Sequence, residues 1–330
     1  MKRRLIASLL FIAAVTCAPV VHASYSGLYV FGDSLSDTGN NAFYIGADPT
    51  QTITGNTYIP TNPYASGQYS NGNVWVHTFA AGLGLSPLPV VAGGGVFAFG
   101  GAQTSVNPPP YGFPPSLTTQ MGMFFSLTGG YAPSNSLYVI AGGGNNARAA
   151  LEAIGGGADV QATIGATAAQ YAADIGAMVD SLQAAGAKDI VVWNTPNLGL
   201  APAIAAGGPS VSFLGMAVAS TMNGALAAEL SDETGVRLFD VFGLVTSIAM
   251  NPGLYGLSNV KDACGAIAGC DASQYLFWDG IHPTATGHAI LGNAMAAAIP
   301  EPETYALLIA GLGILLFEAR RRRARPARVG

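Results

Sequence analysis

The plan of the chain follows from one stretch near its N-terminus, Leu28-Tyr29-Val30-Phe31-Gly32-Asp33-Ser34-Leu35. Its first four residues are apolar, and such a run is typical of a strand that is buried on both faces of a parallel sheet. Ser34 stands just past this strand, at the edge of the sheet where α/β proteins bind their ligands. Three further runs of the same character lie at residues 137–141, 190–193 and 236–239.

Helical spacing of apolar residues separates these runs, at residues 74–83, 161–185 and 213–230. Strands that alternate with helices predict an α/β fold, in which a parallel sheet lies between two helix layers. Three segments rich in Gly, Pro, Asn and Ser interrupt the pattern, at residues 50–72, 93–115 and 251–273. We interpret them as loops rather than linkers, because each returns to an apolar element.

The N-terminal end has the pattern of a secretory signal peptide. Lys2-Arg3-Arg4 precedes an apolar run, and Val21-His22-Ala23 then offers small residues before Ser24. We therefore assign residues 1–23 to a signal peptide. A membrane anchor is the alternative, but the apolar run is short for a spanning helix and Pro19 interrupts it.

The C-terminal end carries a second targeting pattern. Pro300-Glu301-Pro302 leads into an apolar segment at residues 305–317, and five arginines follow within residues 320–325. Arginines behind an apolar segment indicate a membrane-inserted stretch with its basic end in the cytoplasm; a buried core helix is the alternative. Residues 299–330 resemble the PEP-CTERM sorting signal of Gram-negative bacteria. The resemblance implies an extracytoplasmic protein, transiently anchored by this segment and processed by an exosortase.

The part between these ends, residues 24–298, has the length of one large α/β domain. Of the 13 basic residues of the chain, three precede residue 24 and six follow residue 300, whereas 15 of the 18 acidic residues lie between them. With four basic residues against 15 acidic ones, this part of the chain lacks the basic surface that binds nucleic acid. The two remaining cysteines, Cys264 and Cys270, lie in a Gly-rich loop, and we expect a disulfide in an oxidising compartment. Without a nearby pair of histidines, two thiols are too few for a zinc site.

Ser34 is the candidate nucleophile. A serine needs a base to take its proton and a third group to orient that base. The chain lacks a Gly-x-Ser-x-Gly elbow near a strand, and a lone serine after a strand is often a helix cap. The candidate base is His282, because Asp279 precedes it by three residues across a glycine-containing turn. His77 and His288 fall in expected helices, where a packed or surface role is expected.

Two glycine-rich segments offer donors for an oxyanion. Asn145 follows Gly142-Gly143-Gly144 directly after the predicted strand at residues 137–141, and its carboxamide can donate an N–H. A second run, Phe97-Ala98-Phe99-Gly100-Gly101-Ala102, offers a backbone N–H. Either run taken alone would be an ordinary tight turn.

Taken in order, these blocks resemble the SGNH or GDSL hydrolases. Besides the segments already quoted, Gly67-Gln68-Tyr69-Ser70-Asn71-Gly72 looks like the family's next loop, and residues 186–199 look like its fourth-strand segment. The resemblance implies a three-layer α/β/α sandwich with a five-stranded parallel sheet, and no metal or organic cofactor. It also implies Ser34 as the nucleophile, with Asp279 and His282 as its acid–base pair. Ser34, Gly101 and Asn145 would then form the oxyanion hole.

Two residues depart from the family pattern, and the substrate stays open. Asn146 stands where an aspartate usually follows the asparagine, and Val96 replaces a common asparagine, which puts loop support and substrate fit in doubt. We expect a lipase or esterase that cleaves carboxylic esters, of lipids, of short acyl groups or of O-acetylated polysaccharides. Acyl transfer from the same acyl-enzyme is the nearest alternative. A non-enzymatic, glycan-binding surface protein is a third, although the chain keeps every catalytic residue.

An acyl pocket has several candidate lining residues. These are Phe99, residues 108–111, Phe113 and residues 121–125. The alternative, which we favour, is that Met121, Phe124 and Phe125 form the packed face of a helix.

Overall fold

The structure is a computed structural model, and it describes residues 25–56, 60–107, 112–299, 311–315 and 317. The expected signal peptide at residues 1–23 lies outside these ranges. Most of the expected sorting segment at residues 299–330 also lies outside these ranges. Its described residues 311–315 and 317 are helical. Residues 25–298 form one unit, and the site lies within it.

The four predicted strands are confirmed, each to within one residue. They are β1 (Leu28–Gly32), β2 (Leu137–Ala141), β3 (Asp189–Trp193) and β4 (Val236–Phe239), and they form a parallel sheet in that order. All five residues of β2 are buried, as expected for a strand covered on both faces.

The expected fifth strand is reduced to a single bridge. Among the described residues the sheet has four strands, and residues 95–99 run beside β1 in the fifth place. Val96 forms an isolated parallel bridge with Val30, and the Phe97 N–H donates to the Val30 carbonyl at 2.7 Å. Glycines at residues 93–95 and 100–101 flank this pairing, and glycine is a poor strand former. The ladder therefore stays too short to count as a strand.

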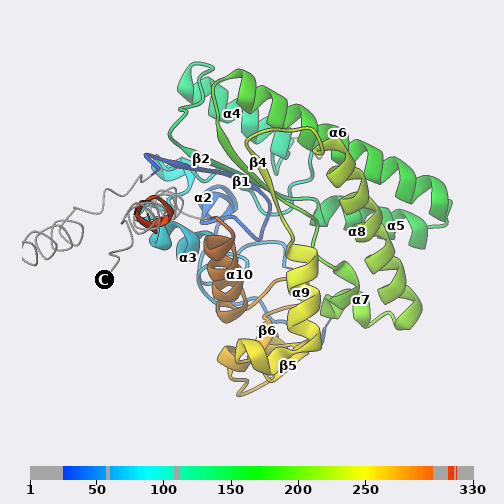
Figure 1. The fold of residues 1–330 in the computed structure, drawn as a ribbon. Coiled ribbons are helices and arrows are strands. Elements are labelled where there is room, and N and C mark those ends of the chain that lie inside the picture. The colour runs from blue at the N-terminus through cyan, green and yellow to red at the C-terminus, as the bar shows by residue number, and fades with distance from the viewer. Residues whose placement is uncertain (1–24, 57–59, 108–111, 300–310, 316, 318–330) are drawn as a thin grey trace, which may run out of the picture. The chain divides into compact units, whose positions relative to one another are not determined.

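Helices cover both faces of the sheet, so the expected three-layer α/β/α architecture is confirmed (Figure 1). On one face, alternate strand residues such as Tyr138 and Ile140 share a core with four helices. These are α4 (Leu117–Thr128), α5 (Gly144–Gly155), α6 (Val160–Ala184) and α8 (Pro209–Glu229). On the other face lie α3 (Trp75–Gly82) and α10 (Ala285–Ala298), where Trp193 of β3 packs against Trp75 with ring centroids 4.4 Å apart.

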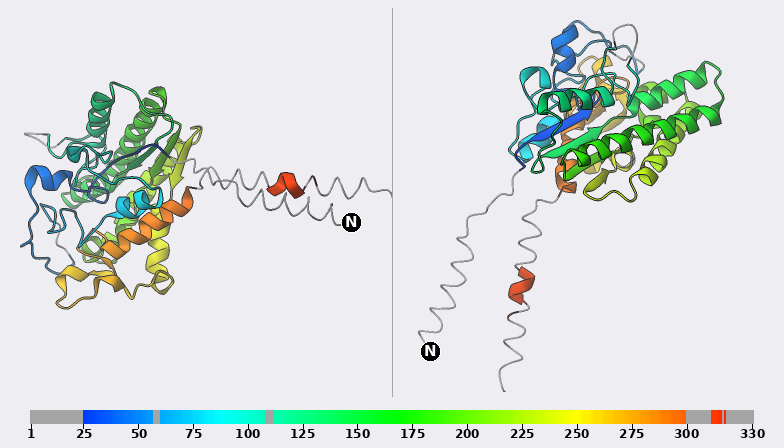
Figure 2. Two further views of the ribbon diagram at one scale, coloured as in Figure 1. Left: turned by 90° about the vertical axis from the view of Figure 1, so that its left-hand side faces the viewer. Right: turned by 90° about the horizontal axis from the view of Figure 1, so that it is seen from above.

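Among the described residues, α8 alone is long and apolar enough to cross a membrane by length and composition. It lies beside α6 (Figures 1 and 2). Val218, Met222 and Leu226 of α8 are fully buried in the core that both helices share with the sheet. This buried face of α8 therefore has a packing explanation, whereas Val211, Phe213 and Met216 of the same helix are exposed.

The remaining elements are short helices, 3₁₀ turns and a second sheet. The helices are α2 (Asn40–Ile45), α7 (Pro202–Ala205) and α9 (Val241–Met250), and the short 3₁₀ turns are η1 (Val90–Ala92), η2 (Leu198–Leu200), η3 (Pro252–Tyr255), η4 (Cys264–Ala266) and η5 (Ala272–Gln274). A second, two-stranded parallel sheet joins β5 (Asn259–Ala263) to β6 (Tyr275–Phe277). A disulfide links Cys264 to Cys270 in the connection between these two strands.

Candidate active site

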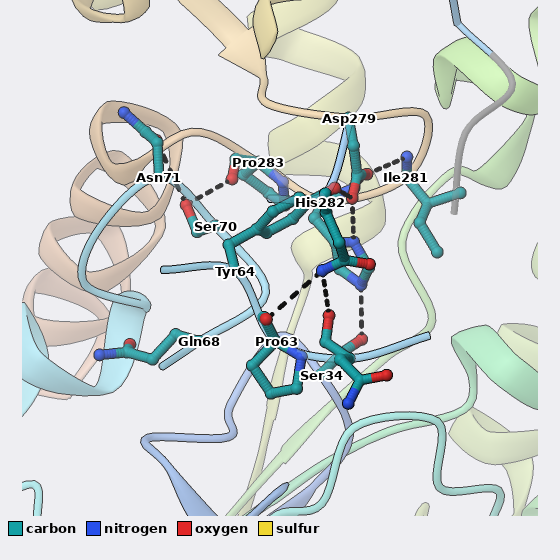
Figure 3. A network of polar contacts seen from close by, with 12 residues as sticks. Ser34, Pro63, Tyr64, Gln68, Ser70, Asn71, Asp279, Ile281, His282 and Pro283 are labelled. Carbon is teal, nitrogen blue, oxygen red and sulfur yellow. Dashed lines mark hydrogen bonds and ion pairs between the residues drawn. The ribbon is translucent and has the colours of Figure 1, made fainter. Parts of the chain in front are cut away.

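Ser34, His282 and Asp279 form a continuous chain of hydrogen bonds (Figure 3). The Ser34 Oγ lies 2.8 Å from His282 Nε2, and His282 Nδ1 lies 2.7 Å from an Asp279 carboxylate oxygen. Ser34 is 8% exposed, His282 3% and Asp279 0%, so the chain opens to solvent only at its serine end. This is the geometry of an activated serine, a base and an orienting carboxylate.

The turn after β1 presents Ser34 at the edge of the sheet. β1 ends at Gly32, whose N–H and carbonyl are both bound by the Gln120 side chain of α4, at 2.9 and 2.8 Å. The chain then turns sharply, because the Asp33 carbonyl accepts the N–H groups of Ser36 and Asp37. A fixed strand end followed by a tight turn holds the serine in one place.

The loop between β6 and α10 carries both Asp279 and His282. One Asp279 carboxylate oxygen accepts the backbone N–H groups of Ile281 and His282, at 2.8 and 2.7 Å. The other oxygen accepts from His282 Nδ1 and, at 2.7 Å, from the hydroxyl of Tyr64. Four donors therefore fix a carboxylate that is fully buried, as a buried charge requires.

The loop that contains Tyr64 also holds the segment after His282 (Figure 3). The Tyr69 ring lies 5.4 Å from the imidazole of His282, centroid to centroid. The Ser70 hydroxyl donates to the Pro283 carbonyl at 2.9 Å, and the Asn71 side chain accepts the N–H of Ala285 at 2.8 Å. The sequence block at residues 67–72 therefore has a structural role, since it holds the imidazole and the segment that follows it. Sequence reasoning missed Tyr64, which precedes that block.

The two other histidines of the domain stand apart from this chain of bonds. His288 is fully buried in α10, and burial lowers its pKa to about 3. His77 is half-buried in α3, and burial lowers its pKa as well. Neither makes a side-chain hydrogen bond to Ser34 or Asp279 in the described part of the chain. Within that same part, no group of three His, Cys, Asp or Glu side chains is placed to hold a metal ion.

Asn145 lies beside Ser34 with its amide held at both ends. Its Nδ2 donates to the Ala102 carbonyl at 2.9 Å, and its Oδ1 accepts from the Arg148 guanidinium at 3.0 Å. A donor at one end and an acceptor at the other fix which way the amide points, and one Nδ2 hydrogen stays available. Gly101, next to Ala102, has φ +85°, a conformation that favours glycine. Ser34 and Asn145 line one pocket, whereas Gly101 lies outside the residues that line it.

A buried carboxylate ties the loop of Ser34 to the loop of Gly101. Asp37 accepts the backbone N–H groups of Gly39, Asn40 and Asn41 from its own loop, and that of Gly100 at 3.0 Å. Burial outweighs these bonds and raises the Asp37 pKa to about 6. The pKa of Asp33 is also raised to about 6, because its side chain is buried beside Ser34.

Asn146, which replaces the aspartate of the family pattern, still binds the neighbouring loop through its side chain. Asn146 Oδ1 accepts the Thr104 N–H at 3.1 Å, and Asn146 Nδ2 donates to the Thr104 hydroxyl at 2.9 Å. That hydroxyl donates in turn to Asp174 of α6 at 2.5 Å. The carboxylate of this hydrogen-bond network thus comes from Asp174 of α6. Val96, the second departure, forms the bridge to Val30.

A pocket with an empty volume of about 830 Å³, which includes open solvent, begins at Ser34 and His282. Its walls come from α5, η2, α7, α9, β6 and α10. None of the described residues that the sequence offered for an acyl pocket lines it, and residues 108–111 lie outside the description. Met121 and Phe124 belong to the core between α4 and the sheet, as the packing alternative holds. Phe99 is buried as well.

Comparison with known proteins agrees with this geometry. Residues 28–295 match the GDSL-like lipase/acylhydrolase family, and residues 298–323 match the PEP-CTERM protein-sorting motif, which indicates export with membrane-associated sorting. The chain is 31% identical to Esterase EstA of Pseudomonas aeruginosa over 92% of its own length, and it spans about half (51%) of EstA. A GDSL esterase/lipase of Arabidopsis thaliana is 28% identical, with 80% of this chain and 86% of that protein covered.

A third relative differs in its reaction. The phosphatidylcholine-sterol acyltransferase of Aeromonas hydrophila is 24% identical, with 91% of this chain and 97% of that protein covered. Relatives named as esterases and one named as an acyltransferase thus both match most of this chain. The family match at residues 28–295 contains the four strands and the Ser34–His282–Asp279 chain of bonds. The protein belongs to the GDSL-like lipase/acylhydrolase family.

Proposed function

We propose that the protein hydrolyses carboxylic esters through an acyl intermediate on Ser34. The observation that carries the proposal is the hydrogen bond of 2.8 Å between Ser34 Oγ and His282 Nε2, with Asp279 behind the imidazole. In the first step, the Ser34 oxygen attacks the ester carbonyl carbon and His282 Nε2 takes the hydroxyl proton. The bond to the alcohol then breaks, and the alcohol leaves with the proton that His282 returns.

Water completes the cycle. His282 takes a proton from a water molecule, which attacks the acyl carbon, and the bond to Ser34 breaks with that proton returned to its oxygen. The carboxylic acid leaves and the enzyme is restored. Asp279 stabilises the imidazolium that forms in both halves of the reaction.

The negative charge that develops on the carbonyl oxygen needs donors already in place. We assign this role to the backbone N–H groups of Ser34 and Gly101 and to the free Nδ2 hydrogen of Asn145. The assignment of Asn145 is supported by its clamped amide beside Ser34. That of Gly101 rests on the resemblance and on its position next to Ala102, the carbonyl partner of Asn145.

Turnover of a p-nitrophenyl ester by the purified Ser34→Ala variant tests the proposal. We expect loss of activity with an unchanged far-UV circular dichroism spectrum, because the side chain is small and adjoins a pocket. Trapping with a fluorophosphonate provides a second readout: wild type should gain the mass of the adduct on the peptide containing Ser34, and Ser34→Ala should not. Unchanged turnover by Ser34→Ala would end the proposal.

Acyl transfer is the second candidate function, favoured by the match to the Aeromonas acyltransferase over nearly the whole of both chains. The same acyl-enzyme reacts with an alcohol in place of water when an alcohol occupies the site. Product analysis in the presence of glycerol or a sugar separates the two. Free acid as the main product supports hydrolysis, and a new ester supports transfer.

We further propose that the protein is exported from a Gram-negative cell and that an exosortase removes its C-terminal segment. The sorting motif at residues 298–323 and the disulfide between Cys264 and Cys270 support an extracytoplasmic site. Mass spectrometry of the protein from its host should find a chain that begins near residue 24 and ends near residue 300. An intact chain in the cytoplasm would contradict this.

A further inference from the structure

We propose that the pocket beside Ser34 binds the acyl half of the substrate and selects esters of medium-length fatty acids over acetyl esters. This inference rests on the proposed ester hydrolysis and names the class of substrate. It also distinguishes among the lipid, short-acyl and O-acetyl substrates that the sequence leaves open.

The walls of the pocket are mostly apolar away from the catalytic groups, with Phe277 among them. Leu198, Ala201 and Ile204 come from η2 and the start of α7, Val245 comes from α9 and Leu291 comes from α10. Val245 and Leu291 are 9% and 1% exposed, so this part of the wall is formed by buried side chains, whereas Leu198 and Ile204 are partly exposed. Residues far apart in the chain thus converge on one apolar chamber that begins at the nucleophile.

The polar side chains of the pocket lie near Ser34 or are satisfied within the wall. Asn197 accepts the Gly199 N–H and donates to the Thr246 hydroxyl, at 3.2 and 3.1 Å. Arg148 holds Asn145 and forms an ion pair with Glu152 at 3.3 Å. The chamber thus offers a substrate few polar partners, which disfavours a sugar or a charged group within it.

An acetyl group would leave most of this chamber unfilled. Its single methyl reaches only the first wall residues, whereas a longer chain removes the apolar walls from water. Each methylene that enters the chamber should raise kcat/KM by about fourfold, until the chamber is full. A steep rise from acetate to a medium chain follows, and it should end when further carbons have no wall to contact.

The first experiment measures kcat/KM of the purified protein on p-nitrophenyl acetate, butyrate, hexanoate, octanoate and decanoate, all below their micelle concentrations. We expect a rise of at least about fiftyfold from acetate to the best chain. A second measurement compares two isomers, ethyl octanoate and octyl acetate, which carry the same chain on opposite sides of the ester. We expect ethyl octanoate to be the better substrate.

Variants locate the chamber. Val245→Phe adds a ring to its wall and should lower the octanoate-to-acetate ratio of kcat/KM at least tenfold while acetate turnover persists. Ile204→Phe changes another lining residue, from α7, and serves if Val245→Phe does not fold by circular dichroism. Val211→Phe places the same ring on an exposed part of α8, outside the pocket, and should leave the profile unchanged.

Each outcome supports or overturns either the acyl pocket or the proposed ester hydrolysis. An active wild type with a flat profile, or one that prefers acetate, overturns the acyl chamber but leaves ester hydrolysis standing. Preference for octyl acetate overturns it as well, because the alcohol would then occupy the chamber. If wild type cleaves none of these esters while it is folded, the proposed function itself has failed.

Discussion

Removal of the Tyr64 hydroxyl tests whether this residue supports the acid–base pair or takes part in the chemistry. The hydroxyl donates at 2.7 Å to the Asp279 oxygen that also binds His282, and Tyr64 is 6% exposed. A hydrogen bond to a charged group contributes about 1.5–3 kcal/mol to stability. Tyr64→Phe should therefore lower the free energy of unfolding by about that amount.

The effect on catalysis should be smaller. Asp279 carries its negative charge both before and during the attack by Ser34, so most of the bond to Tyr64 is equally strong in the two states. What changes is the fixing of the carboxylate, and we expect kcat to fall by about three- to tenfold with KM nearly constant. Asp279→Asn, which alters the partner of the imidazole itself, should cost about ten-thousandfold.

The assay pairs urea unfolding with steady-state turnover of p-nitrophenyl butyrate. Tyr255→Phe is the matched control, because its half-buried hydroxyl makes a neutral bond to Ser247 at 3.0 Å, outside the site. The control should lose about 0.5–1.5 kcal/mol of stability and keep its kcat. Unchanged stability and turnover in Tyr64→Phe would refute the reasoning. A thousandfold loss of kcat would refute it too, since Tyr64 would then act on the reacting groups.

Three further changes have defined outcomes. Asn145→Ala should lower kcat by about a hundred- to a thousandfold and leave KM nearly unchanged, and single-turnover kinetics would check this. A rise in KM as large as the fall in kcat would contradict an oxyanion role. Gly100→Ala should unfold the domain at a lower temperature, because a Cβ there would collide with the ring of Tyr69, whereas Gly224→Ala, with open space at its Cβ, should be neutral or stabilising in the same melt. Burial raises the Asp33 pKa to about 6, so the folded protein binds the carboxyl proton more tightly than the unfolded chain does. The ionisation of Asp33 therefore lowers the free energy of unfolding as the pH rises from about 4 to about 6. Asp33→Asn should therefore gain about 2–3 kcal/mol relative to wild type between pH 4 and pH 7 in urea titrations, and a difference that is constant with pH would contradict the burial argument.

The sheet and the acid–base pair were predictable from the sequence because local signals specify them. Buried parallel strands appear as short apolar runs, and the placement of Ser34 after one of them needs no knowledge of distant contacts. The pairing of Asp279 with His282 is likewise local, since three residues and one turn separate them. The fifth strand, which the family resemblance implies without a position, was not predictable in this way. Residues 95–99 lie within a segment interpreted as a loop, and their short pairing with β1 depends on the neighbouring strand.

The pocket and its supports were out of reach for the opposite reason. Leu198, Val245 and Leu291 lie in three separate elements, and no period or spacing relates them. The aromatic residues near residue 120 have the same apolar character as true lining residues, yet the side of the helix they occupy faces the core. Tyr64 carries no signal of its own; only its position just before the loop block at residues 67–72 hints at a role.

The separation of the two halves of the site has a consequence for when activity begins. Ser34 lies in the first turn after β1, whereas Asp279 and His282 lie between the last strand of the domain and its last helix, 248 residues from Ser34 in the case of His282. A ribosome makes the chain from its N-terminus, so the nucleophile exists long before its base does. Under the proposed mechanism, a chain that ends before Asp279 cannot cleave an ester. Activity would begin only when the end of the domain has docked, so completion of the fold would switch it on.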